Sequence, residues 1–166
     1  SDSLSWHIWK LLTDKVMPYE ELREYVILFL EGKYSSGAMS KLALIFEELA
    51  KIAPEDASTF YERALISLEN YLKSKPADAS QHWINATEEI LPILAKEPKR
   101  LVRVIERLKN IWMMRTQIYI GNIQMIFGSY ELVAPEYKEE VKVQLKGMYD
   151  EMKAVHPLLQ EVDWTK

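Results

Sequence analysis

The residues best suited to chemistry in this chain form a basic row near its middle. Residues 96–115 include seven basic and two acidic residues, a net charge of +5 in a chain whose total charge is −4. On a helix, Arg100, Arg103 and Arg107 fall within a sector of about 60°, and Lys96 extends the row. Arginine pairs well with phosphate and carboxylate oxygens. We therefore interpret these four residues as a candidate binding site for an acidic or phosphorylated peptide. The alternative is a solvated helix face, neutralised by acidic residues of neighbouring helices.

Metal and catalytic chemistry have no matching motif in the sequence. His7, His82 and His156 lie far apart, and none belongs to the His-x-x-x-His or Glu-x-x-His spacings that helical metal sites use. The chain has no cysteine to act as a thiol nucleophile, and it has no glycine-rich phosphate-binding loop. We expect a protein that is not an enzyme, with no catalytic residue, metal or cofactor.

A second set of candidate residues is apolar. The segment 111–127 is apolar on nearly every side of a helix, which is typical of a helix that is either central in the core or shared with a partner. Met113, Met114 and Phe127 in this segment, with Trp6 and Trp9 near the N-terminus, form a candidate interface. Such an interface would suit a structural or self-associating subunit of a larger complex. Central burial and a partner surface both remain open for these residues.

Prolines and glycines mark the elements that must position these residues. Pro54, Pro76 and Pro98 stand 22 residues apart, and each closes a segment of helical length. The apolar periodicity predicts helices over about 4–16, 18–32, 35–53, 56–73, 78–96, 98–133 and 135–154, with a short tail after Pro157. The long segment 98–133 is expected to bend at Gly121 or Gly128. This order predicts an all-α protein of seven or eight antiparallel helices in an array like that of helical-repeat proteins.

Length and composition limit the remaining possibilities. A chain of 166 residues suits one domain, with 1–133 as the main helical array and 134–166 as a C-terminal helical extension. No apolar run approaches the ~18 residues of a membrane span, so we expect no membrane association. The absence of cysteine favours a reducing, intracellular compartment. The acidic total charge and the lack of a groove-reading motif make nucleic acid an unfavoured partner.

One short motif resembles a known family. The segment 106–112 (Glu-Arg-Leu-Lys-Asn-Ile-Trp), followed by Arg115, is similar to the penultimate-helix signature of CTD-interacting domains. The order and lengths of the first five predicted helices resemble that family too, over about residues 4–127. The resemblance implies a right-handed superhelix of the VHS/ENTH-like kind that binds the phosphorylated tail of RNA polymerase II. The family's central helix holds a tail hydroxyl with an aspartate, for which Glu69 is the available substitute here.

These patterns together predict a protein-interaction or scaffold module. It would bind an extended acidic or phosphorylated peptide along the basic row, in the nucleus or the cytoplasm. The alternative is a structural subunit that dimerises through its apolar and tryptophan-rich surfaces.

Overall fold

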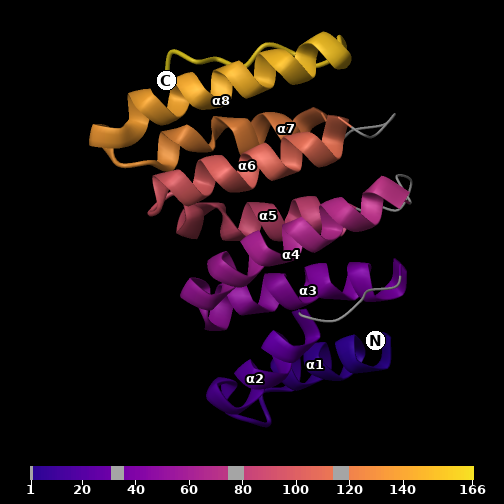
Figure 1. The fold of residues 1–166 in the computed structure, drawn as a ribbon. Helices are drawn as coiled ribbons and strands as arrows, with labels where there is room; N and C mark the ends of the chain where they lie inside the picture. The colour runs from indigo at the N-terminus through magenta and orange to yellow at the C-terminus, as the bar shows by residue number, and fades with distance from the viewer. Residues whose placement is uncertain (1, 31–35, 75–80, 114–119) are drawn as a thin grey trace.

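The chain folds into a stack of helices. The structure is a computed structural model and describes residues 2–30, 36–74, 81–113 and 120–166. In chain order the elements are α1 (Asp2–Asp14), α2 (Tyr19–Leu30), α3 (Ser36–Ile52), α4 (Pro54–Ser74), α5 (Gln81–Leu94), α6 (Pro98–Met113), α7 (Ile120–Phe127), the 3-10 segment η2 (Gly128–Leu132) and α8 (Pro135–Val155). Figure 1 shows them following one another through the stack, with the two chain ends at opposite ends of it. The described ranges contain helices and no β-strand, which confirms the all-α prediction.

The helices are arranged in two layers. The odd-numbered helices contact one another in series, from α1 to α3, α5 and α7, and the even-numbered helices do the same from α2 to α4, α6 and α8. Each even-numbered helix also packs on the odd-numbered helix before it. Pairs of antiparallel helices stacked in this way are the architecture of helical-repeat proteins, in which each pair buries its apolar faces against its neighbours.

Proline placement explains where the even-numbered helices begin. Pro54, Pro98 and Pro135 are the first residues of α4, α6 and α8, and Pro18 directly precedes α2. Proline suits this position because its fixed φ fits a helix and its missing N–H would have no helical partner there. The prolines at the starts of these helices therefore recur once per helix pair, and the 44 residues from Pro54 to Pro98 are twice the 22-residue interval. Pro76 lies outside the described residues.

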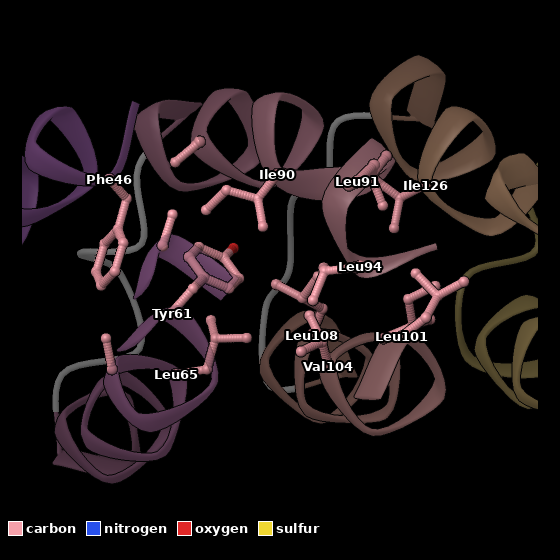
Figure 2. Close-up of a cluster of buried hydrophobic side chains, with 14 of the residues drawn as sticks. Phe46, Tyr61, Leu65, Ile90, Leu91, Leu94, Leu101, Val104, Leu108 and Ile126 are labelled. Carbon is pink, nitrogen blue, oxygen red and sulfur yellow. The ribbon is translucent and has the colours of Figure 1, made fainter. Parts of the chain in front are cut away.

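A continuous apolar core runs between the two layers. Buried side chains extend from Ile8 in α1 to Leu159 beyond α8. Figure 2 shows its central part, where Tyr61 of α4 lies among side chains of the neighbouring helices. The Tyr61 ring meets Phe46 edge-on at 5.4 Å, and its buried hydroxyl pairs with the hydroxyl of Thr87. This pairing satisfies two polar groups that would otherwise be costly to bury.

The predicted long helix over 98–133 is wrong. α6 ends at Met113 and α7 begins at Ile120 as a separate helix in the other layer, where it contacts α5. The division has a packing reason, because a single helix could not bury apolar side chains on all its sides within a two-layer array. The helix does change at Gly128, where α7 passes into η2. Gly121 belongs to α7, and the expected stop of the second helix at Gly32 lies outside the described residues.

The C-terminal part of the chain completes the stack. α8 packs on α6 and contributes Val141, Leu145, Tyr149 and Met152 to the same core. The segment after α8 contains no further helix and folds back along it, as the yellow trace in Figure 1 shows. The right-handed twist of the array stays a prediction.

Candidate functional site

The predicted basic row lies on α6 and on the turn before it. Lys96 is exposed in that turn, and Arg100, Arg103 and Arg107 follow one another along the helix. The opposite face of α6 supplies Leu101, Val104, Ile105, Leu108, Ile111 and Trp112 to the core. The strong separation of charged and apolar residues on α6 thus places the cations away from the apolar core.

Two acidic residues, Glu62 of α4 and Glu97 in the turn before α6, pair with two of these arginines. Arg103 Nε donates to Glu62 Oε1 at 2.6 Å, and Arg100 Nε donates to Glu62 Oε2 at 3.1 Å. Arg100 Nη1 also donates to Glu97 Oε2 at 2.7 Å. Part of the row is therefore neutralised by neighbouring acids, as the alternative interpretation of the sequence expected.

The shared carboxylate of Glu62 is the electrostatic centre of this cluster. The hydrogen bond from Arg103 and the charges of Arg103 and Arg100 hold the pKa of Glu62 below its usual range, although partial burial opposes the shift. The same bond raises the pKa of Arg103. The side chain of Arg100 is 22% exposed, whereas that of Arg103 is 53% exposed. The Arg103 side chain is therefore accessible from solvent, whereas the Arg100 side chain is mostly covered and bonded to Glu62 and Glu97.

A hollow of about 580 Å³ lies between the N-terminal parts of α6 and α8. Its lining from α6 and the preceding residue is Glu97, Pro98, Lys99, Arg100, Val102 and Arg103, and its lining from α8 is Tyr137, Glu140, Val141 and Gln144. We call this hollow the α6–α8 groove. It brings Arg100 and Arg103 of the predicted row together with apolar side chains that the row itself does not contain.

The parallel course of α6 and α8 explains the shape of the groove. Their N-terminal parts line the hollow, while further along Lys109 Nζ pairs with Glu151 Oε2 at 2.7 Å. His156, just after α8, also lies 3.3 Å from the Trp112 carbonyl oxygen through its Nε2 atom. Polar contacts thus link the two helices toward their C-terminal ends, and the hollow lies toward their N-terminal ends.

The remaining members of the basic row have other surroundings. Arg107 is half-buried on α6, and neither it nor Lys96 belongs to the groove lining. Lys99, which was not among the predicted site residues, lies exposed in the groove wall. The structure therefore gathers Lys99, Arg100 and Arg103 and leaves the two ends of the predicted row outside.

The candidate interface residues do not gather at one place. Trp6 is 46% exposed, whereas Trp9 is half-buried and packs against the core. Met113 lies at the surface, and Met114 lies outside the described residues. Phe127 is fully buried and packs edge-on against Tyr149, so its assignment to an exposed interface is wrong. Central burial holds for Phe127 because α7 turns this side chain towards α8.

The α8 wall of the groove was missed by sequence reasoning. Tyr137, Glu140, Val141 and Gln144 follow the i, i+3, i+4, i+7 spacing of one helix face, which was the available signal. That spacing alone does not say which helix the face meets. Glu62 was missed for the same reason, since it lies 41 residues before Arg103 in the chain. The side chain of Glu69 lies outside the described residues.

The described ranges offer no candidate for two further classes of site, a metal site and a membrane-spanning helix. Their His, Asp and Glu side chains include no group of three placed to hold a metal ion. No helix in those ranges is both long and apolar enough to cross a membrane.

Comparison with known proteins identifies no relative of this chain. No protein-family model, curated protein or solved structure matches this chain. The resemblance to CTD-interacting domains stays a prediction.

Proposed function

We propose that this protein is a non-enzymatic interaction module that binds an extended acidic or phosphorylated peptide in the α6–α8 groove. The observation that carries the proposal is the groove itself, where three cationic side chains stand beside apolar ones at the surface of a helical array. Helical-repeat arrays commonly present extended binding surfaces of this kind.

Arg103 and Lys99 are the cations best placed to meet a ligand. Lys99 is exposed, and the side chain of Arg103 is half exposed beside the hollow. A phosphate or carboxylate entering the groove would compete with Glu62 for Arg103, since both offer oxygens to the same planar donor group. The ligand therefore binds against an internal competitor, which favours a doubly charged phosphate over a single carboxylate.

The apolar part of the groove adds a second requirement on the ligand. Val102 of α6 faces the same hollow as Tyr137 and Val141 of α8. An apolar side chain of the peptide that entered between them would remove apolar surface from water, worth roughly 25 cal/mol per Å². We therefore expect the preferred peptide to carry an apolar residue next to its acidic or phosphorylated one.

The direct experiment is fluorescence anisotropy with two labelled peptides. They share one sequence, with a serine between apolar residues, and differ only in phosphorylation of that serine. A phosphorylated peptide from the RNA polymerase II tail is a third probe, chosen for the resemblance noted above. We expect the phosphorylated forms to bind more tightly, and their affinity to fall as salt is raised, because salt screens exposed charges.

Charge reversal of Arg103 tests where binding occurs. Arg103→Glu should weaken binding of the phosphorylated peptide by at least about tenfold, because a hydrogen bond to a charged group contributes about 1.5–3 kcal/mol. The matched control is Lys146→Glu, at an exposed cation of α8 that does not line the groove. Equal losses in both variants, or binding that does not change with salt, would contradict the proposal.

A second candidate function rests on the surface of the first helix pair. Trp6 on α1 is exposed, as are Tyr25 and Leu28 on α2. Exposed aromatic and aliphatic side chains are typical of protein interfaces. This surface supports the alternative of a structural or self-associating subunit.

Sedimentation equilibrium separates this candidate from the first. Self-association through the first helix pair predicts a dimer at micromolar concentration that Leu28→Glu converts to monomer. Arg103→Glu should leave that dimer unchanged, since the two surfaces share no residue. A wild-type monomer at the same concentrations would contradict self-association.

A further inference from the structure

The segment after α8 lies against the protein like a bound peptide. Residues 156–166 form no regular helix or strand and run back along α8. Leu159 is buried in the core, and the Trp164 ring stacks on Tyr130 at 5.6 Å. We call the surface beneath this segment, formed by Tyr130 and Tyr149, the tail seat.

Two tyrosines of the tail seat hold the segment by its backbone. Tyr130 Oη donates to the Asp163 carbonyl oxygen at 3.0 Å, and Tyr149 Oη donates to the Gln160 carbonyl oxygen. Hydrogen bonds to backbone carbonyls do not depend on the side chains that the segment carries. Specificity therefore rests on the apolar side chains that pack on the core, chiefly the buried Leu159 and the stacked Trp164, which are five positions apart.

The tail packs on the core with Leu159, Val162 and Trp164, whereas its outer side is open to solvent. Leu158 is 84% exposed, and the ion pair of Glu161 with Lys153 of α8 lies at the surface. A hollow of about 460 Å³ lies beside the tail, lined by Met125 of α7 and Glu131 of η2 as well as by tail residues. The tail thus lies beside an open hollow, and its release would break the two tyrosine hydrogen bonds, the Glu161–Lys153 ion pair and the packing of its apolar side chains on the core.

We propose that the tail seat is a second peptide-binding site, for an extended segment of another protein with a leucine and an aromatic residue five positions apart. The chain's own tail occupies the site and competes with that segment. The proposal is independent of the α6–α8 groove, since the two sites have no lining residue in common. Because the tail is tethered to α8, its effective concentration at the seat is on the order of millimolar. Binding of a partner is therefore weak until the tail is released.

The experiment uses a labelled peptide of residues 156–166 added to the full chain. We expect the Trp164→Ala protein to bind this peptide at least about tenfold more tightly than the wild-type protein, because its own tail competes poorly. A Leu158→Ala protein is the matched control, since that side chain points to solvent, and it should bind as weakly as the wild type. The peptide with Trp164→Ala should not bind, whereas the peptide with Leu158→Ala should bind normally.

Two outcomes of this experiment would overturn the proposal. One is that the folded Trp164→Ala protein does not bind the peptide, and the other is that it binds no better than the wild type. Sedimentation of the same samples tests another occupant. A wild-type dimer that Trp164→Ala dissociates would assign the seat to the tail of a second copy and overturn the assignment to a foreign segment.

Hydrogen exchange of the wild-type protein keeps the proposal testable if Trp164→Ala does not fold. Local opening exposes amides without global unfolding. We expect the amides of residues 160–166 to exchange much faster than those in the middle of α8. Equal protection of the tail and of α8 would show a permanently fixed tail and overturn the proposal.

Discussion

At the scale of single residues, Glu62 pairs with two cations of the predicted basic row. Its carboxylate accepts hydrogen bonds from both Arg100 and Arg103, and these bonds connect α4 to α6. One of them engages Arg103, the more exposed of the two arginines in the groove. A corresponding joint lies between α2 and α4, where Asp56 accepts hydrogen bonds from Tyr19 at 2.5 Å and from Arg23 at 2.8 Å. Single acidic residues thus connect successive even-numbered helices.

These acidic residues predict a loss of stability in acid. The pKa of Glu62 is lowered from its ordinary value of 4.5, mainly by the hydrogen bond from Arg103. Burial would raise the pKa of Asp56, but hydrogen bonds from Arg23 and Tyr19 outweigh it and lower the pKa from 3.8. A lowered folded-state pKa stabilises the fold above the unfolded-state value, and this contribution is lost as pH falls through the folded-state pKa. The urea concentration at the midpoint of unfolding should therefore decrease when the pH is lowered below about 4.5.

Glu62→Gln is the variant that checks the source of this pH dependence. Glutamine keeps the size of the side chain but cannot be titrated. The variant should be less stable than the wild type at pH 7 and should lose less of its stability between pH 5 and pH 3. If the variant lost as much as the wild type over that range, Glu62 would not be one of the groups responsible.

The sequence could predict only one wall of the site. The spacing of Arg100 and Arg103 places them on one helix face without knowledge of any other element. Their pairing with Glu62, and the position of Tyr137 opposite them, depend on how three helices stack. No local pattern contains that information, because the residues involved are about 40 positions apart.

At the scale of elements, each helix is stabilised mainly by the face it buries. Leu65 and Ile66 are adjacent on α4 and similar in size, yet Leu65 is fully buried and Ile66 is 41% exposed. Leu65→Ala should lower the free energy of unfolding by about 2–5 kcal/mol, because it removes buried apolar volume and leaves a cavity. Ile66→Ala is the matched control and should cost about 1 kcal/mol or less.

Chemical denaturation of the two variants measures this difference. Equal losses would mean that α4 does not present the face described here to the core. The prediction is independent of the groove, so it tests the packing of the array and not the proposed function.

Helix boundaries could be predicted where a local signal marks them. Pro54, Pro98 and Pro135 stand at the first positions of helices, where a backbone N–H would have no helical partner. Each of these prolines is visible in the sequence. The separation of α6 from α7 could not be predicted in the same way. The segment 111–127 is apolar on all sides, and whether such a segment remains one helix depends on the layers available to cover it.

At the scale of the whole molecule, the two ends of the array differ. The tail covers the last helix pair with Leu159 and Trp164, whereas the first helix pair exposes Trp6 and Leu28. Terminal units of helical-repeat proteins need a covering for their outer face. The tail therefore gives the last helix pair such a covering.

Glu62→Gln in the peptide-binding experiment tests the central claim most directly. If the α6–α8 groove binds an acidic group through Arg103, removing its internal competitor should raise affinity for the phosphorylated peptide several-fold, while Arg103→Glu lowers it. Glu106→Gln, at an exposed position of α6 outside the groove lining, gives the same change in net charge and should have little effect. An unchanged or lower affinity in a folded Glu62→Gln protein would contradict the account.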